Sequence, residues 1–301
     1  MACELFIPWK PHAGTLAIVE QANTIIEEYL AQTFRLTLRQ LFYQFVARAL
    51  LENQFTQYKR LGSIIRNARD GGLVDWDAIE DRTREVHTHQ FWNHPRAIIS
   101  DDAEVYREDL WKGQRYRPEV WIEKDALIGV IEGVCTELRV PYFAHRGNNS
   151  QTLQYQAGKR FARYLGQGLI PLVLHLADHD PNGIDMTRDN IKRLALYARA
   201  DIEVRRIALN MDQVRLYRPP PSFVKEGDTR TTGYRERFGT DECWELDALS
   251  PTVIADLIRS EIEGLIDQRA WDAALTSEQH GSELLADVAK NWTKGRKAVG
   301  A

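Results

Sequence analysis

The sequence of 301 residues is poor in cysteine, and its three cysteines, Cys3, Cys135 and Cys243, lie far apart. An odd number of widely spaced cysteines supports neither a framework of disulfide bonds nor a zinc site built on a Cys-x-x-Cys pair. The sequence also lacks an apolar run near the ~18 to 20 residues that cross a bilayer, and its N-terminus lacks a secretory signal pattern. We therefore expect a cytoplasmic protein that has no membrane partner.

The chain also lacks an overall excess of basic residues. Its net charge of −4 at pH 7 argues by itself against a protein that binds nucleic acid without specificity. The distribution of charge changes this view, because residues 35–69 include seven basic residues and one acidic residue, a balance of +6. Such a stripe is typical of a surface that tracks phosphate groups, although an exposed helix face can also carry one.

The first hundred residues are predicted to form three helices. Apolar residues recur at helical spacing over 15–31, a second helix begins after Thr37 as its N-cap, and a third spans 57–69. With the following segment as a wing, which comprises Leu73-Val74-Asp75-Trp76 and the polar stretch through 82–85, these helices match a winged helix-turn-helix. The third helix would then present four basic side chains to DNA: Lys59, Arg60, Arg66 and Arg69. The alternative is an ordinary helical bundle with arginines on its surface.

Beyond residue 119, short apolar runs alternate with helical patterns. The runs that predict strands are 120–122, 140–144, 170–177 and 202–209, and the helical patterns are 126–138, 151–165 and 184–198. Strands separated by crossover helices form a parallel sheet with helices on both faces, so the fold class is α/β.

The last third of the chain is predicted to begin with an extended connector at Pro219-Pro220-Pro221. Ser250 and Pro251 then open a helix whose apolar stripe is expected to pack against the sheet or against a second subunit. The predicted domains are a winged-helix DNA-binding domain over 1–100, a metal-binding α/β domain over 115–218, and a connector with a C-terminal helical extension over 219–301.

Two of the predicted strands end abruptly in carboxylates. Glu123 follows the strand 120–122, and Asp178 and Asp180 follow the strand 170–177. Ligands bind at the carboxyl ends of strands in open α/β sheets, and three converging carboxylates repel one another unless a cation lies among them. Oxygen ligands without Cys or His favour Mg²⁺, or Mn²⁺, over zinc. The alternative is that Asp180-Pro181-Asn182-Gly183 is only a turn before a helix, which leaves Glu123 and Asp178 unexplained.

Three histidines, His87, His89 and His94, also lie close together in the sequence. No carboxylate or cysteine has a convincing ligand spacing to them, so we expect surface or packing histidines and no metal site.

The acidic motifs resemble those of a Toprim domain, the metal-binding fold of topoisomerases, bacterial primases and related nucleases. A Glu closes the first strand, and Asp-x-Asp closes the third. The stretch Leu38-Arg39-Gln40-Leu41-Phe42-Tyr43 resembles the Arg-x-x-(Tyr/Phe)-Tyr motif in the winged-helix domain of the A subunit of DNA topoisomerase VI and of its meiotic double-strand-break relative. The resemblance covers roughly residues 36–209 and the order of the two domains, and it is strongest to small prokaryotic or mobile-element-borne members of this family.

This resemblance implies Mg²⁺-dependent cleavage of double-stranded DNA by transesterification. Tyr43 would be the nucleophile and would form a 5′-phosphotyrosyl link, while Arg39 would activate it or hold the phosphate. Glu123, Asp178 and Asp180 would bind Mg²⁺, and Glu123 would also serve in acid/base chemistry.

The resemblance also implies a homodimer that acts on nucleoid DNA. Each active site would combine Tyr43 of one protomer with the three acids of the other. Strand passage would require a separate ATPase subunit, because the chain has no Gly-rich segment that could bind ATP.

Two other functions fit the same residues. A Toprim nuclease would hydrolyse DNA with a metal-bound water, and Tyr43 would then be a core residue beside Leu41, Phe42 and Phe45. A catalytically inactive DNA-binding protein would bind DNA without cleaving it.

Overall fold

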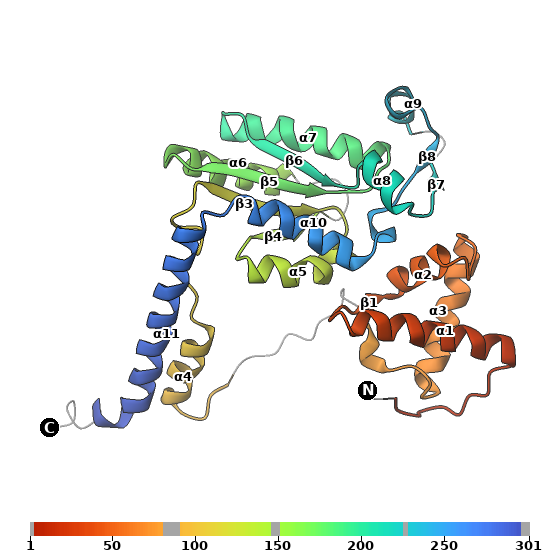
Figure 1. The fold of residues 1–301 in the computed structure, drawn as a ribbon, viewed down its shortest axis with the longest axis horizontal. Helices are drawn as coiled ribbons and strands as arrows, with labels where there is room; N and C mark the ends of the chain where they lie inside the picture. Colours follow the sequence, from red (N-terminus) through yellow and green to blue (C-terminus); the bar gives the residue numbers. More distant parts are fainter. Residues whose placement is uncertain (1–2, 81–90, 146–150, 225–227, 296–301) are drawn as a thin grey trace.

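The structure is a computed structural model, and it describes residues 3–80, 91–145, 151–224 and 228–295 (Figure 1). It contains an N-terminal helical unit, a parallel sheet covered by helices, and a pair of helices that projects away from the sheet. Among the described residues, no helix combines the length and the apolar character needed to cross a membrane.

The N-terminal helical unit is built around one apolar core. Its helices are α1 (Ala13–Leu30), α2 (Leu38–Ala47) and α3 (Phe55–Asp70). The N-terminus of α2 is fixed as predicted: the Oγ1 atom of Thr37 accepts a hydrogen bond from the Gln40 N–H at 3.2 Å, and Gln40 Oε1 accepts one from the Thr37 N–H at 2.8 Å. This reciprocal capping satisfies two of the N–H groups that a helix leaves without partners.

The segment after α3 leads back toward α2. A short 3-10 helix, η1 (Trp76–Ala78), precedes β2 (Ile79–Glu80), which pairs in parallel with β1 (Leu36–Thr37). The polar stretch 82–85 of the expected wing lies outside the described residues. The winged helix therefore stays a prediction, while the three helices on which it rests are present.

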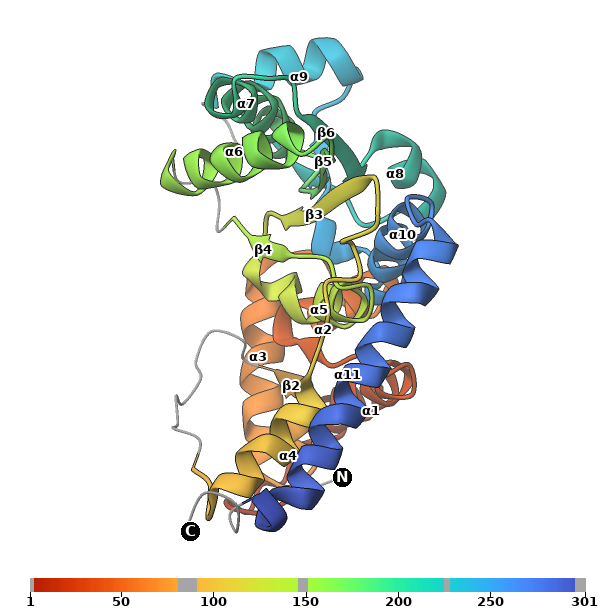
Figure 2. The same cartoon turned by 90° about the vertical axis from the view of Figure 1, so that its left-hand side faces the viewer.

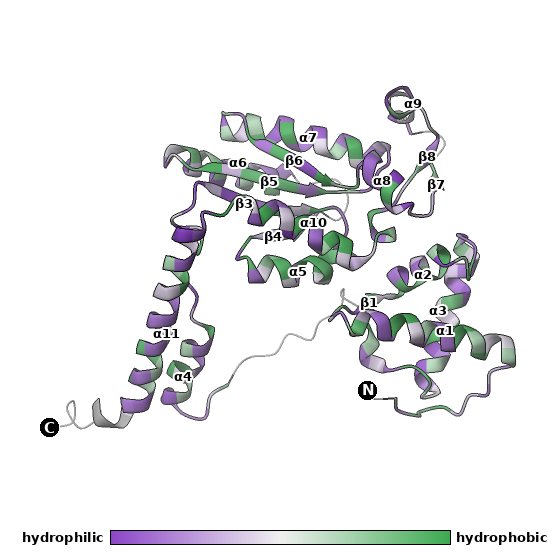
Figure 3. Cartoon of the chain, viewed as in Figure 1, coloured by the Kyte–Doolittle hydropathy of each residue, from purple (hydrophilic) through white to green (hydrophobic). Residues whose placement is uncertain are grey.

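A four-stranded parallel sheet forms the centre of the remaining chain, which confirms the predicted α/β class. Its strands are β3 (Tyr116–Ile122), β4 (Tyr142–Ala144), β5 (Ile170–Leu176) and β6 (Glu203–Ala208), in the order β4-β3-β5-β6. Strand β5 is hydrophobic along most of its length (Figure 3), as a strand covered on both faces should be. Ile122 pairs with Leu176 of β5 and Ala144 of β4, so the carboxyl ends of three strands lie level.

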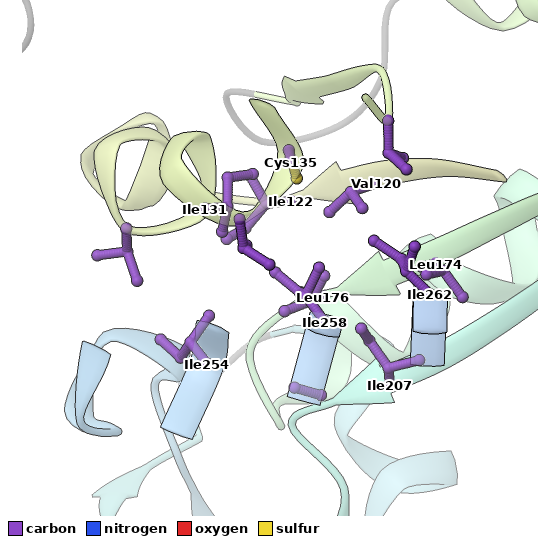
Figure 4. Packing of buried hydrophobic residues seen from close by; sticks show 14 of the residues in the cluster. Val120, Ile122, Ile131, Cys135, Leu174, Leu176, Ile207, Ile254, Ile258 and Ile262 are labelled. Atoms are coloured by element: carbon purple, nitrogen blue, oxygen red, sulfur yellow. The ribbon is translucent and has the colours of Figure 1, made fainter. Parts of the chain in front are cut away.

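Helices cover both faces of the sheet (Figure 2). One face carries α5 (Ile128–Glu137), which follows the 3-10 helix η2 (Asp125–Leu127), and α10 (Pro251–Glu263); the other carries α6 (Gln151–Gly166) and α7 (Pro181–Ala198). Ile254, Ile258 and Ile262 of α10 are fully buried in the sheet core (Figure 4). Of the two partners expected for the apolar stripe of α10, the sheet is the one observed.

The other elements after the sheet are mostly short. They are α8 (Met211–Tyr217), β7 (Ser222–Phe223), α9 (Thr231–Phe238), β8 (Glu242–Cys243) and the 3-10 helix η3 (Leu246–Ala248). Strands β7 and β8 pair antiparallel. The segment at η3 joins the two parts of the molecule, because Leu246 lies in the sheet core and Ala248 in the core of the N-terminal helical unit.

Helices α4 (Pro95–Val105) and α11 (Gln268–Gly295) lie side by side and project from the sheet (Figures 1 and 2). His94 caps α4, its Nδ1 atom accepting a hydrogen bond from the Ala97 N–H at 3.2 Å. This contact gives His94 a structural role, as expected for it; His87 and His89 lie outside the described residues.

Candidate active site

The structure brings the three predicted metal ligands into one pocket at the carboxyl edge of the sheet. The Glu123 N–H donates to the Leu176 carbonyl oxygen at 2.9 Å, and the Asp178 N–H donates to Glu123 Oε2 at 2.9 Å. One backbone hydrogen bond thus extends the pairing past the end of β3, and the Glu123 carboxylate then binds the backbone at Asp178, which brings the acidic residues together. We call this hollow of about 400 Å³ the acidic pocket; its charged lining includes Arg39, Glu123, Lys124, Asp178, Asp180 and Glu245.

Asp180 is also the N-cap of α7. Its Oδ1 atom accepts a hydrogen bond from the Gly183 N–H at 2.6 Å. A Cβ atom at Gly183 would lie 2.2 Å from the Asp178 carbonyl oxygen, so only glycine allows the start of α7 to approach Asp178 this closely. Residues 180–183 therefore do form a turn that begins a helix, as the alternative prediction held. The same turn also places Asp180 in the lining of the acidic pocket.

A partly buried arginine that the sequence analysis did not single out supports the loop after β5. Arg206 of β6 donates hydrogen bonds to the carbonyl oxygens of Ala177, Asp178, Gly183 and Leu209 and to Thr187 Oγ1, at 2.6 to 3.1 Å. Burial lowers the pKa of Arg206 to about 10. The only signal in the sequence was an arginine within a predicted buried strand.

Four further charges connect the acidic pocket to the helix that carries Tyr43. Lys124 Nζ lies 3.0 Å from Asp178 Oδ1, 2.9 Å from Glu245 Oε2 and 2.8 Å from Asp247 Oδ1. On the other side, Arg39 Nε lies 3.0 Å from Asp247 Oδ2, and the guanidinium also forms an ion pair with Glu245. Lys124, Glu245 and Asp247 were not predicted as site residues, because Glu245 and Asp247 are distant in sequence and belong to no recognised motif.

The charges of the pocket shift its pKa values in opposite directions. Burial, followed by repulsion from Asp178, raises the pKa of Glu123 to about 7, and burial also raises the pKa of Asp178. Burial would raise the pKa of Glu245 as well, but Lys124 and Arg39 outweigh it and lower the value to about 2. Lys124 therefore compensates the repulsion between Glu123 and Asp178 only in part, and a further cation would relieve the remainder.

The chemistry of the donor set fits a hard cation. The recorded hydrogen bonds and ion pairs of Asp178 and Asp180 engage one oxygen, Oδ1, of each carboxylate, so the second oxygen of each can meet a cation. Within residues 3–80, 91–145, 151–224 and 228–295, no three His, Cys, Asp or Glu side chains are already grouped as a metal cage. In the structure described here, Lys124 provides the positive charge next to Asp178.

Tyr43 lies beside this charge network in the same chain. Arg39 Nη2 donates to the Tyr43 hydroxyl oxygen at 3.4 Å. Tyr43 is only 6% exposed and packs on Phe42, so it is also a core residue of the N-terminal helical unit. Burial, together with the negative charges of Asp247 and Glu245, raises the pKa of Tyr43, and the hydroxyl is therefore a neutral phenol in this arrangement.

The four basic residues predicted to contact DNA differ in their surroundings. Lys59, Arg60 and Arg66 are exposed on α3, and Lys59 and Arg66 line a groove of about 520 Å³ together with Trp76. Arg69 is half-buried: its Nη2 atom donates to the Trp76 carbonyl oxygen at 2.8 Å and also to that of Ile79. Arg69 therefore holds η1 and β2 against α3, whereas the other three are oriented to solvent.

Comparison of the chain with models of protein families, with curated proteins and with solved structures finds no match. The function is accordingly inferred from the residues of the site and from their arrangement.

Proposed function

We propose that this protein cleaves the phosphodiester backbone of double-stranded DNA in a Mg²⁺-dependent reaction at the acidic pocket. The observation that carries the proposal is the meeting of Glu123, Asp178 and Asp180 at the ends of adjacent parallel strands. Arg39 and Lys124 line the same pocket and supply positive charge for a phosphate group. The adjacency of the two acid-bearing strands is compatible with the Toprim resemblance, which remains part of the proposal.

In this reaction the three carboxylates would hold Mg²⁺, or Mn²⁺ in its place. The metal supplies charge neutralisation and polarises the scissile phosphate when it is bound. Tyr43 would attack the phosphorus atom, the bond to the 3′ oxygen would break, and the strand would stay linked through a 5′-phosphotyrosyl bond. Arg39 would stabilise the phenolate through its contact with the Tyr43 hydroxyl, and Glu123 would combine ligation with acid/base work.

A double-strand break by this route requires two tyrosines, so we propose a homodimer that acts on nucleoid DNA. Strand passage would further require a separate ATPase subunit. The sequence resemblance implies that Tyr43 of one protomer serves the acids of the other. Within one chain, Arg39 lines the acidic pocket whereas Tyr43 lines the hollow next to it, so a site within each protomer is the alternative to the shared site.

One observation favours hydrolysis as the second candidate. The Tyr43 side chain is buried, and its pKa is raised rather than lowered, so the hydroxyl is not activated as it stands. In that case water would be the nucleophile, and Tyr43 would only pack in the helical core.

The test is incubation of the protein with supercoiled plasmid and Mg²⁺, followed by denaturation with and without protease. Transesterification predicts breaks whose 5′ ends carry protein; hydrolysis predicts the same breaks without protein.

Asp178→Asn should abolish cleavage by either route, because the cation site loses a carboxylate. Tyr43→Phe should abolish only the tyrosine route, and Tyr29→Phe, which changes another buried tyrosine of the same core, is the matched control. Metal-independent cleavage, or cleavage by Asp178→Asn at the wild-type rate, would refute the metal site.

Mixing Tyr43→Phe with Asp178→Asn chains separates the two dimer arrangements. A site within each protomer predicts no cleavage by the heterodimer, since each chain lacks one part. Recovery of single-strand nicking would instead show that each site is shared between protomers.

A further inference from the structure

A second pocket adjoins the acidic pocket, and its lining is aromatic. It has a volume of about 320 Å³, within the range of small-molecule sites. We call it the aromatic pocket; its rings are those of Phe42, Tyr43, Phe55, Tyr58 and Phe223. Arg39, Ser222, Phe223 and Glu245 line both pockets, so the two hollows are continuous.

Two of these rings are exposed in a way that packing does not explain. Phe55 at the start of α3 is 68% exposed, and Phe223 of β7 is 74% exposed. They come from the two different parts of the molecule, which are tied together here by a hydrogen bond of 3.2 Å from Asn53 Nδ2 to the Pro221 carbonyl oxygen. Phe55 also stacks on Tyr58, with ring centroids 6.2 Å apart, so the pocket is lined by aromatic rings from both parts of the molecule.

Polar groups around the rings select the class of ligand. Lys59 Nζ lies 4.6 Å from the centre of the Phe55 ring, and Arg39 stands at the boundary with the acidic pocket. The amides of Asn53 and Gln54 also lie in the lining, where their N–H groups donate to the Pro221 carbonyl oxygen at 3.2 Å and to Glu52 Oε2 at 2.8 Å, so a ligand would exchange with these partners. Aromatic faces suit a planar base, amides suit its hydrogen-bonding edge, and cations suit its phosphates.

We propose that the aromatic pocket binds an unpaired nucleobase next to the phosphate held in the acidic pocket. This inference rests on the proposed function, and it adds that the DNA segment at the site is unstacked: either a base leaves the duplex or the substrate is single-stranded there. Stacking between Phe55 and Phe223 would hold the base, and Asn53 and Gln54 would contact its edge.

The experiment uses DNA oligonucleotides that carry a single 2-aminopurine, whose fluorescence reports stacking, titrated with the full-length protein in Ca²⁺. We expect a fluorescence change at one position of a single strand and binding weakened about tenfold or more by the combined change Phe55→Ala and Phe223→Ala. Phe223→Tyr keeps an aromatic ring at this position, so this single variant should bind the oligonucleotide as tightly as the wild type does. Phe91→Ala removes a phenyl ring that is 87% exposed outside the pocket and should leave binding unchanged. Phe223→Leu keeps apolar volume without a ring, so it tests stacking even if the alanine variant unfolds.

The outcomes separate this inference from the proposed function. Wild-type affinity in both Phe223→Leu and the double alanine variant would overturn the base pocket, whatever the cleavage assay shows. Loss of base binding in these variants supports the pocket even if plasmid cleavage fails. An aromatic peptide that competes with the oligonucleotide while Arg39→Ala leaves DNA affinity unchanged would identify a peptide as the ligand and overturn the inference.

Discussion

The sheet domain and the N-terminal helical unit hold their polar residues in different ways. At the carboxyl edge of the sheet, Glu123 and Asp178 are fixed by backbone N–H groups and are held at the end of a rigid ladder. In the helical unit, packing also accounts for the positions of Tyr43 and Arg69. Tyr43 is buried in the apolar core, and Arg69 is half-buried and hydrogen-bonded to backbone carbonyl groups. A polar residue after a strand is therefore a clearer sign of a site than one on a helix, where burial offers a second explanation.

The largest effect that would test this comparison concerns Arg206. Arg206→Met removes five hydrogen bonds, most of which tie the loop between β5 and α7 and the start of α7 to β6, so we expect a loss of roughly 3 kcal/mol in the free energy of unfolding. The Ala177 carbonyl oxygen keeps its hydrogen bond from the Leu209 N–H, and that of Gly183 keeps one from Thr187 Oγ1. Urea denaturation measures the loss. Arg205→Met is the matched control on the same strand, because its ion pairs with Glu203 and Glu261 are partly exposed and contribute about 1 kcal/mol or less. Equal midpoints for the two variants would show that the site does not depend on Arg206.

A smaller effect separates the two kinds of basic residue on α3. Arg69→Ala should lower the free energy of unfolding by roughly 1 to 2 kcal/mol, because Arg69 hydrogen-bonds to the carbonyl groups of Trp76 and Ile79. Arg66→Ala should change stability by less than ~0.5 kcal/mol. The reverse order is expected for DNA binding: Lys59→Ala with Arg66→Ala should lower the slope of log affinity against log salt by about two. An unaltered slope would place the DNA track elsewhere.

The last effect depends on pH and concerns two buried histidines of the sheet domain. His145 lies edge-to-face with His175 at 5.3 Å, and burial lowers the pKa of His145 to about 3 and that of His175 well below 6.5. As the pH falls, these two histidines are protonated in the unfolded chain near pH 6.5 but in the folded protein only at lower pH. Their contribution to the free energy of unfolding is therefore fully present above pH 6.5 and is lost as the pH falls from 6.5 toward 3. His145 contributes up to roughly 1.4 kcal/mol per pH unit in that window, and His175 acts in the same direction.

His145→Phe tests this contribution. The variant should lose less stability than the wild type between pH 6.5 and pH 4, as followed by urea denaturation at each pH. The exposed His280 of α11 provides the control, since His280→Phe should keep the wild-type slope. Parallel curves for His145→Phe and the wild type would contradict the prediction.

Much of the sheet domain could be predicted from its sequence because apolar runs and helical patterns alternate there without ambiguity. The adjacency of Glu123 and Asp178 did not follow from the rule that strands joined by one crossover helix pair in parallel. Their strands are β3 and β5, and β4 comes between them in the chain but lies on the far side of β3 in the sheet. The contributions of Glu245 and Asp247 could not be predicted, because they reach Lys124 through tertiary packing of a segment that has no periodic pattern. Arg206 was missed for a related reason: its partners are backbone carbonyl groups, which every sequence contains.

For Tyr43, the sequence supported two different predictions. Its motif predicted a nucleophile, and its apolar neighbours predicted a core residue; in the structure its ring is buried while its hydroxyl contacts Arg39. The core position is observed, whereas the nucleophile stays a prediction, which the cleavage assay on Tyr43→Phe would test.

The partners of the acidic residues have a consequence for biosynthesis. The Leu246 N–H donates to Asp178 Oδ1 at 2.8 Å, and Asp247 binds both Lys124 and Arg39. During translation, the ribosome exports Glu123 and the two aspartates well before this segment. A nascent or truncated chain that ends before Glu245 would therefore hold the carboxylates but not the arrangement around them, and the pocket is completed only when the last quarter of the chain has been made.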